Sequence, residues 1–262
     1  MSSKEPIIQG FAGQVVLVTG GASGIGEAAA KQLAEHGANV AIADLNREAA
    51  GALASSLRDK ALHAKSFHVD VGNEQSVEQL IANVVDDYGD LHAVINCAGI
   101  ADLPQKLINM PLEKYERMIR VNQTSIFLCL KHELRHFMSK TAEQRVGRAI
   151  VNVSSGAAFI PAPGQAHYTA AKHAVVGLTH YAASEYAGEG IRVNVVCPGL
   201  TDTPMPAAAV PREMLTAMEK SNPAGRMGSA DEVAAACVWL VSNQASWVNG
   251  QSLVVDGGQL FH

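Results

Sequence analysis

The stretch QVVLVTGGASGIGEAAAKQLAEHG, residues 14–37, joins a short apolar run to a glycine-rich turn and then to an alanine-rich segment. The apolar run predicts a buried strand, and the spacing after the turn predicts a helix. Glycine permits a tight turn, lets backbone N–H groups approach a pyrophosphate, and lets the helix pack closely on the strand. The helix N-terminus would present free N–H groups to that anion. The turn therefore predicts a dinucleotide site, and a plain tight turn is the alternative.

The rest of the chain repeats this alternation of strand and helix. Valine- and isoleucine-rich runs recur, separated by longer amphipathic segments. Runs that are apolar on both faces suit strands buried between two helical layers, and their alternation with helices indicates a parallel sheet. Right-handed crossovers then predict an α/β fold, a doubly wound sheet of about seven strands with helices on both faces. The expected strands are 14–19, 39–44, 66–71, 91–96, 148–154, 191–197 and 251–256.

Two segments interrupt this rhythm, but no linker, repeat or low-complexity tract divides the chain. Residues 1–262 are therefore expected to form one dinucleotide-binding and catalytic domain. Residues 139–147 are expected to form a polar loop. Residues 198–225 begin PGLTDTPMP and are expected to hold no strand. A long excursion in a compact domain often serves function, so we predict a substrate loop or lid there.

Composition limits the partners of the chain. The formal net charge is −5 and 17% of the residues are charged, without a basic stripe, which argues against nucleic acid. The N-terminal MSSKEPIIQGF lacks the apolar core of a secretory signal, and no apolar run reaches the roughly 18 residues of a membrane helix. The four cysteines form no C-x-x-C pair and are expected to be buried free thiols. These features predict a cytoplasmic protein without membrane association.

Asp44 ends the second expected strand, 18 residues after Gly26. A carboxylate there can accept hydrogen bonds from both adenosine ribose hydroxyls and would repel the 2′-phosphate of NADP. Ser23 stands in the glycine turn where an arginine would pair with that phosphate. Both features favour NAD(H) over NADP(H), whereas Arg47 is a nearby cation that would favour the phosphate. A solvated strand end or a helix cap is the alternative role for Asp44.

The turn T-G-x-x-x-G-x-G at 19–26 resembles that of the short-chain dehydrogenase/reductases and differs from the G-x-G-x-x-G of other Rossmann enzymes. The likeness covers almost the whole chain and implies a Rossmann fold and NAD(H)-dependent oxidoreductase activity. Asp70-Val71 resembles the family's adenine contact. Asn96-Cys97-Ala98-Gly99 resembles its N-N-A-G motif, with cysteine replacing the second asparagine. Pro198-Gly199 and Thr203 resemble its motif on the nicotinamide side.

The stretch GQAHYTAAKHAV, residues 164–175, places Tyr168 and Lys172 one helical turn apart on a shared face. A free phenol has a pKa of about 10, and an ammonium nearby favours the phenolate. Tyr168 would take a proton from an alcohol while hydride leaves for NAD⁺, and would protonate the ketone oxygen in reverse. The resemblance implies cofactor contacts from Gly20, Ser23, Gly24, Ile25, Gly26, Asp44, Asp70, Val71, Asn96, Ala98, Gly99, Tyr168, Lys172, Pro198, Gly199, Thr201 and Thr203.

Two more residues complete the catalytic set by resemblance. Ser155 stands 13 residues before Tyr168, the family's spacing for the serine that binds the reacting oxygen, and Ser154 is one residue off. Asn122 matches the family's catalytic asparagine, which would hold a water that links Lys172 to solvent. The alternatives are a turn residue for Ser155 and a polar kink in a long helix for Asn122. No metal site is predicted, because the histidines lack a ligand pattern with carboxylate support.

The substrate pocket is expected to be mostly apolar and to accept a neutral, small secondary alcohol or ketone, in particular a cyclic one. Arg212, Lys220 and Arg226 are the cations that would serve a charged substrate instead. The expected lining residues are Ile100, Leu103, Ala157, Phe159, Pro161, Gln165, Leu200 and Met205. The small residues of 169–186 resemble the family's dimer interface, and the C-terminal SLVVDGGQLFH resembles its second interface. Together they imply a homotetramer, with a dimer as the alternative. Two other functions are possible for this fold. A cofactor-sensing protein without turnover would lack the Tyr-Lys pair or the serine, and all three residues are present here. An enoyl reductase of the same family would have a wider Tyr-to-Lys spacing than the four residues found here.

Overall fold

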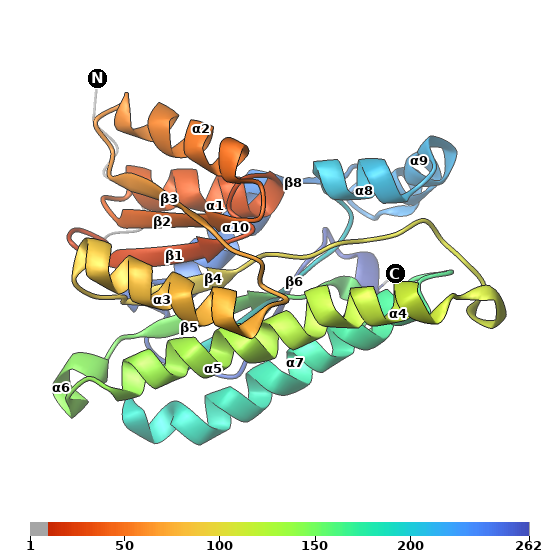
Figure 1. Cartoon of the computed structure of the whole chain (residues 1–262). Coiled ribbons are helices and arrows are strands. Elements are labelled where there is room, and N and C mark those ends of the chain that lie inside the picture. Colours follow the sequence, from red (N-terminus) through yellow and green to blue (C-terminus); the bar gives the residue numbers. More distant parts are fainter. Residues whose placement is uncertain (1–9, 262) are drawn as a thin grey trace.

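The computed structural model describes residues 10–261 and contains a seven-stranded sheet with helices on both faces (Figure 1). Every neighbouring pair in the sheet is parallel, in the order β3-β2-β1-β4-β5-β6-β9. This confirms the predicted doubly wound α/β fold. The strands are β1 (Val15–Thr19), β2 (Asn39–Asp44), β3 (Ala64–His68), β4 (Ala93–Asn96), β5 (Ala149–Val153), β6 (Arg192–Pro198) and β9 (Ser252–Val255).

Two helical layers bury the two faces of the sheet. Successive strand side chains point to opposite faces. Val16 and Val18 therefore pack in one core and Val15 and Leu17 in the other. The first core lies under α1 (Gly24–Glu35), α2 (Arg47–Arg58) and α10 (Ala230–Val241). The second lies under α3 (Glu74–Tyr88), α5 (Ser125–Met138) and α7 (Ala166–Tyr186), which cross the front of the sheet in Figure 1.

The remaining elements are short and lie at the ends of the sheet. The helices among them are α4 (Leu112–Ile119), α6 (Ala142–Arg145), α8 (Pro204–Ala209) and α9 (Arg212–Ser221). A π-helical turn, η2 (Arg120–Thr124), joins α4 to α5. The 3₁₀ turns are η1 (Leu107–Asn109), η3 (Gly156–Ala158), η4 (Ala187–Glu189), η5 (Asn243–Ala245) and η6 (Gln259–Phe261). Strands β7 (Thr201–Asp202) and β8 (Gly228–Ser229) form a separate pair.

The chain order of the strands creates a crevice at one edge of the sheet. β1 pairs with β2 on one side and with β4 on the other, so the connections after β1 and after β4 run in opposite directions. In such sheets the crevice outside the carboxyl ends of the strands is where ligands bind. The glycine-rich turn follows β1 at this point, and α1 begins at Gly24.

Three expectations about segments are corrected by the structure. The 198–225 segment does contain a strand, β7, which pairs with β8. A two-residue strand has no periodic pattern that the sequence could reveal. The 139–147 segment is not wholly a loop, because Thr141 and Gln144 form a capping box that starts α6. β3 ends at His68, before the expected limit of 71, because the Asp70 carboxylate accepts a hydrogen bond from Gly72 N at 2.9 Å and turns the chain.

The N-terminal residues 1–9, on which the prediction about a secretory signal rests, lie outside the described part of the chain. Among residues 10–261, no helix combines the length and the apolar character needed to cross a bilayer.

Candidate active site

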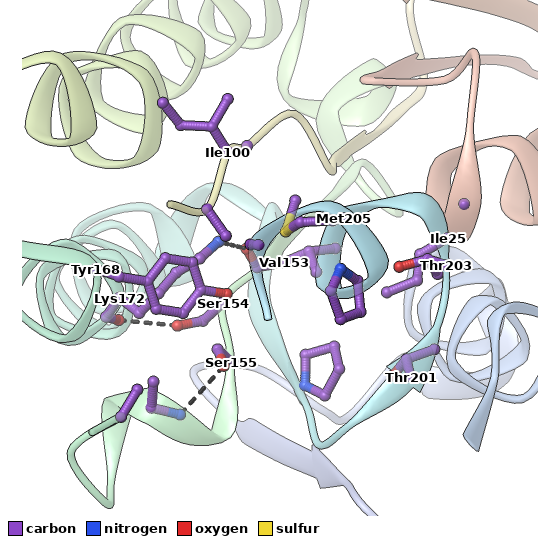
Figure 2. A pocket seen from close by; sticks show the side chains of 18 of the residues that line it. Ile25, Ile100, Val153, Ser154, Ser155, Tyr168, Lys172, Thr201, Thr203 and Met205 are labelled. Atoms are coloured by element: carbon purple, nitrogen blue, oxygen red, sulfur yellow. Dashed lines mark hydrogen bonds between the residues drawn. The ribbon is translucent and has the colours of Figure 1, made fainter. Parts of the chain in front are cut away.

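A cleft of about 960 Å³ opens at the carboxyl ends of the strands. Its walls come from the glycine turn after β1, the ends of β2, β4, β5 and β6, the start of α7, and the segment that carries α8 and α9. Figure 2 shows the side chains that converge there from elements far apart in the sequence. The cleft is large enough for a dinucleotide and a small second molecule together.

The glycine turn leaves no room for side chains where it meets its neighbours. Gly20 has φ +65°, and a Cβ on it would lie 2.6 Å from the Cα of Ala98. Gly24 has φ +54°, and a Cβ there would lie 3.2 Å from the Cβ of Thr203. Ser23 precedes α1 without capping it through its side chain, so the first N–H groups of the helix stay free for an anion. This cradle fits the pyrophosphate of a dinucleotide.

Asp44 links the glycine turn to the end of β2. One carboxylate oxygen accepts a hydrogen bond from Ala22 N at 3.1 Å, and the other accepts one from Asn46 N at 2.8 Å. A carboxylate has about four acceptor positions, so capacity remains for ribose hydroxyls. The helix cap of α2 is Asn46 rather than Asp44, because the Asn46 side chain accepts from Ala49 N. Arg47 is exposed and does not line the cleft.

Tyr168 and Lys172 face the cleft from the first turns of α7 (Figure 2). The Lys172 Nζ atom lies 5.6 Å from the centre of the Tyr168 ring. Lys172 is 5% exposed, and its Nζ donates to the backbone oxygen of Val153 at 3.0 Å. The end of β5 thus holds a buried ammonium beside the phenol.

Ser154 and Ser155 follow β5 and make different hydrogen bonds. Ser154 is buried, and its Oγ donates to the backbone oxygen of Lys172 at 2.8 Å. The Ser155 Oγ accepts from Ala157 N at 3.1 Å and donates to no group in the described chain. The Ser155 hydroxyl proton is therefore free for an oxygen bound in the cleft, whereas the Ser154 proton is already used.

Asn122 lies in the π-helical turn η2 and does not line the cleft. It is 1% exposed, and its side chain makes a reciprocal pair of 2.8 Å hydrogen bonds with the backbone N and O of Ile100. A Cβ on Gly99 would lie 3.2 Å from Asn122 Oδ1 and 3.7 Å from Lys172 Nζ. Asn122 thus holds the loop after β4 against Lys172. π-helical turns are frequent at functional sites.

Most of the predicted site residues meet in this one cleft. It is lined by Gly20, Ser23, Gly24, Ile25, Asp44, Asp70, Val71, Ala98, Gly99, Ser155, Tyr168, Lys172, Pro198, Gly199, Thr201 and Thr203. Gly26, Asn96 and Asn122 do not line it. A Cβ on Gly26 would overlap the backbone oxygen of Gly20, so this glycine lets α1 approach the turn. Asn96 is buried at the end of β4.

The expected substrate residues divide in the same way. Ile100, Ala157, Pro161, Gln165, Leu200 and Met205 line the cleft. Phe159 and Leu103 do not, since their side chains are 45% and 58% exposed outside it. The cations proposed for a charged substrate, Arg212, Lys220 and Arg226, also lie outside the lining, and Arg226 pairs with Glu232 at 2.7 Å.

Several lining residues were not expected from the sequence. Met218 and Ser221 come from α9, and Gln259 and Leu260 come from the last turn of the chain. No local pattern marks these positions, because only the tertiary fold brings them to the cleft.

A buried acid, Glu133 of α5, lies against the end of β4. Asn96 Nδ2 donates to Glu133 Oε2 at 3.1 Å and to Asn152 Oδ1 at 3.1 Å. Burial raises the pKa of Glu133 to about 8, and the hydrogen bond from Asn96 opposes this only in part. The acid therefore carries its proton in the folded protein at neutral pH.

The cysteines and the other titratable groups of the described chain, residues 10–261, form no metal centre. All four cysteines are free thiols, and three of them are buried. Within residues 10–261, no group of three or more His, Cys, Asp or Glu side chains is arranged to hold a metal ion.

Known proteins resemble this chain in both sequence and architecture. The family model described as enoyl-(acyl carrier protein) reductase matches residues 20–259. The chain therefore belongs to the short-chain dehydrogenase/reductase family. It is an oxidoreductase whose fold binds a nicotinamide cofactor.

The individual relatives match over nearly their whole length. Cis-4-hydroxycyclohexanecarboxylate dehydrogenase of Sinomonas cyclohexanicum is 42% identical over 253 residues, which cover 95% of this chain and 98% of the relative. A 2,5-dichloro-2,5-cyclohexadiene-1,4-diol dehydrogenase of Sphingobium indicum is 37% identical over 250 residues, covering 95% and 97%. The crystal structure of 3-ketoacyl-(acyl-carrier-protein) reductase from Brucella melitensis, complexed with NADH, superposes with a TM-score of 0.89 at 32% identity, covering 96% and 100%.

Proposed function

We propose that this protein is an NAD(H)-dependent dehydrogenase that interconverts a secondary alcohol and a ketone on a neutral, mostly apolar, cyclic small molecule. The observation that carries the proposal is that the Tyr168 and Ser155 hydroxyls line one cleft beside the buried Lys172 ammonium. Apolar side chains, among them Ile100, Leu200 and Met205, belong to the same lining. The relatives support a cyclic alcohol, because their names specify hydroxylated six-membered rings and a hydroxysteroid. They do not support neutrality, because the hydroxycyclohexanecarboxylate carries a charge.

The proposed roles follow from the hydrogen-bond donors and acceptors that these side chains leave unused. A bound nicotinamide supplies hydride to the carbonyl carbon or accepts it from the alcohol carbon. The free Ser155 hydroxyl would donate a hydrogen bond to the reacting oxygen and keep its proton. Tyr168, as the phenolate, would remove the alcohol proton, and as the phenol it would return a proton in the reverse direction. The Lys172 ammonium would stabilise the phenolate form. Asn122 would keep the loop after β4 in register with Lys172 and, by resemblance, hold a relay water.

The preference for NAD(H) over NADP(H) is proposed from Asp44. Its carboxylate stands at the end of β2 and is oriented by Ala22 N and Asn46 N. A negative charge fixed there would accept from ribose hydroxyls and repel a 2′-phosphate. Arg47 remains the cation nearest in sequence, and its exposure leaves it free to turn towards a phosphate.

Enoyl reduction is the second candidate, because the matching family model carries that description. The four-residue spacing of Tyr168 and Lys172 favours carbonyl chemistry instead. The two reactions use the same cofactor and differ in the atom that receives hydride, so substrates separate them directly.

We further propose that residues 1–262 form one domain that assembles as a homotetramer, with a dimer as the alternative. Support comes from the outer faces of α5 and α7. Phe127 and Tyr181 are 50% and 67% exposed, and a Cβ on Gly177 would meet nothing within 4 Å. Such an apolar surface beside an open small residue would let a second copy approach closely. The free cysteines support a reducing, cytosolic setting.

The test is oxidation of NADH and of NADPH, measured separately at about pH 7, with cyclic, aryl and aliphatic ketones and with an enoyl thioester, and alcohol oxidation at about pH 9. Turnover of a cyclic ketone with NADH is expected. Turnover of the enoyl thioester alone would favour the second candidate. Silence with every substrate, while NADH still binds, would contradict both.

A further inference from the structure

The last turn of the chain meets the α9 segment, residues 211–225, at the cleft. Gln259 and Leu260 line the cleft together with Met218 and Ser221 of α9. In Figure 1 the C-terminus lies at the same end of the molecule as α4, α8 and α9. The turn is therefore a wall of the site rather than a free tail.

One carboxylate organises this turn. The two oxygens of Asp256 accept hydrogen bonds from Gly258 N and from Leu260 N, both at 2.8 Å. Gly257 and Gly258 have φ values of +66° and +90°, which side chains would strain. The backbone of Leu260 is thus held in place by residues four or fewer positions before it.

A second hydrogen bond connects the turn to the α9 segment. Asn222, which follows α9, is 5% exposed, and its Nδ2 donates to the backbone oxygen of Asp256 at 3.0 Å. Its Oδ1 accepts from Ala224 N at 2.8 Å, so both ends of the amide are used. A Cβ on Gly257 would lie 2.9 Å from Ala224 Cβ, which shows how closely the two segments pack.

The turn also touches the loop that follows β6. Gln259 Oε1 accepts from Leu200 N at 3.3 Å. A Cβ on Gly199 would lie 2.6 Å from the Cβ of Asp256. Three parts of the site, namely the loop after β6, the α9 segment and the C-terminal turn, are consequently joined around Asp256.

We propose that Leu260 is a specificity-determining residue that limits the apolar end of the substrate remote from the carbonyl, and that the Asn222–Asp256 hydrogen bond is a clasp that positions it. The inference rests on the proposed ketone reduction. A side chain carried on a turn with few free torsions can exclude a larger substrate, whereas one on a loose tail would yield to it.

The first arm of the test compares two ketones that differ only in their remote end, cyclohexanone and 4-phenylcyclohexanone, with NADH. Leu260→Ala is expected to raise the ratio of kcat/KM for the larger over the smaller ketone about tenfold, mainly through KM, and Leu260→Phe to lower it. Leu107→Ala removes the same side chain from a 69% exposed position outside the cleft and is the control. A ratio unchanged in both Leu260 variants would overturn the assignment.

The second arm tests the clasp without relying on turnover. Asn222→Asp keeps the acceptor for Ala224 N and removes the donor to Asp256. Hydrogen exchange is expected to quicken both in peptides covering 212–225 and in peptides covering 256–262. Asn83→Asp, on the surface of α3, is the matched control. Faster exchange in only one of the two segments would refute the clasp.

The two arms also separate this inference from the proposed reaction. Coupled exchange in a protein that reduces no ketone would count against the reaction and would support the clasp. Ketone turnover with uncoupled exchange and a fixed substrate ratio would support the reaction and overturn the inference.

Discussion

At the residue scale, the two serines after β5 have separable roles. Ser155 has a free hydroxyl proton, whereas Ser154 spends its proton on the backbone oxygen of Lys172. Ser155→Ala should therefore lower kcat about 10²- to 10³-fold, as expected when a donor to a reacting oxygen is removed. Ser154→Ala should mainly lower the free energy of unfolding, by about 1 kcal/mol. Steady-state kinetics and urea unfolding of both variants measure this, and a larger kcat loss in Ser154→Ala would reverse the assignment.

Asp44 is the second residue whose role can be isolated. Asp44→Ala removes the charge that would repel a 2′-phosphate, so the ratio of kcat/KM for NADH over NADPH should fall about tenfold or more. The substitution also removes the acceptor for Ala22 N and Asn46 N. Asp44→Asn is the control, because it keeps an acceptor while losing the charge. Unchanged selectivity in both variants would mean that Asp44 does not read the ribose.

At the scale of elements, Glu133 couples α5 to the end of β4 and makes stability depend on pH. Burial raises the pKa of Glu133 from 4.5 to about 8, so the folded state keeps a proton that the unfolded state releases between those values. The free energy of unfolding should therefore fall as pH rises across this window, by up to about 1.4 kcal/mol per pH unit. Below about pH 4.5 both states are protonated, and the contribution disappears.

Glu133→Gln should flatten this dependence, because an amide preserves the shape and the acceptor for Asn96 without a titrating proton. The variant is expected to be more stable than the unaltered protein at about pH 8. Urea unfolding at a series of pH values measures the effect. Glu78→Gln, on the exposed face of α3, provides the matched control. Parallel pH profiles for Glu133→Gln and the unaltered protein would contradict the account.

The elements also show which features the sequence could predict. The apolar runs located all seven strands of the main sheet. β1, β4, β5 and β6 are buried throughout, and burial on both faces leaves a continuous apolar signal. β3 is exposed at three of its five residues, and its predicted range overlapped only its last three residues. The sequence did not predict β7, because Thr201 and Asp202 are too few to show a hydrophobic period. The sequence did not predict the π-helical turn at Asn122 either. This turn differs from an α-helix in its backbone hydrogen bonds, and no residue pattern marks that difference.

At the scale of the whole molecule, two kinds of residue build the site, and the sequence could identify only one of them. Motif residues such as Tyr168 and Lys172 could be identified because chemistry restricts them to fixed spacings. Met218 and Leu260 could not, because many apolar residues would serve at these positions and only the tertiary fold brings them together. The cofactor end was therefore more predictable than the substrate end.

Assembly is a prediction at this same scale. Light scattering at micromolar concentration should give about four times the chain mass of 27.6 kDa. Tyr181→Glu, which places a charge on the outer face of α7, should shift the population towards smaller species, because burying an unpaired charge is costly. A monomeric unaltered protein would remove the proposal.

The central claim is that Tyr168 moves the proton during carbonyl reduction in this cleft. The most direct test is NADH oxidation with the best cyclic ketone by the unaltered protein and by Tyr168→Phe, with NADH binding followed by fluorescence. Phenylalanine keeps the ring and removes only the hydroxyl, so the account predicts that kcat falls by about 10²-fold or more while NADH binds with unchanged affinity. Near-normal turnover by Tyr168→Phe would contradict the account.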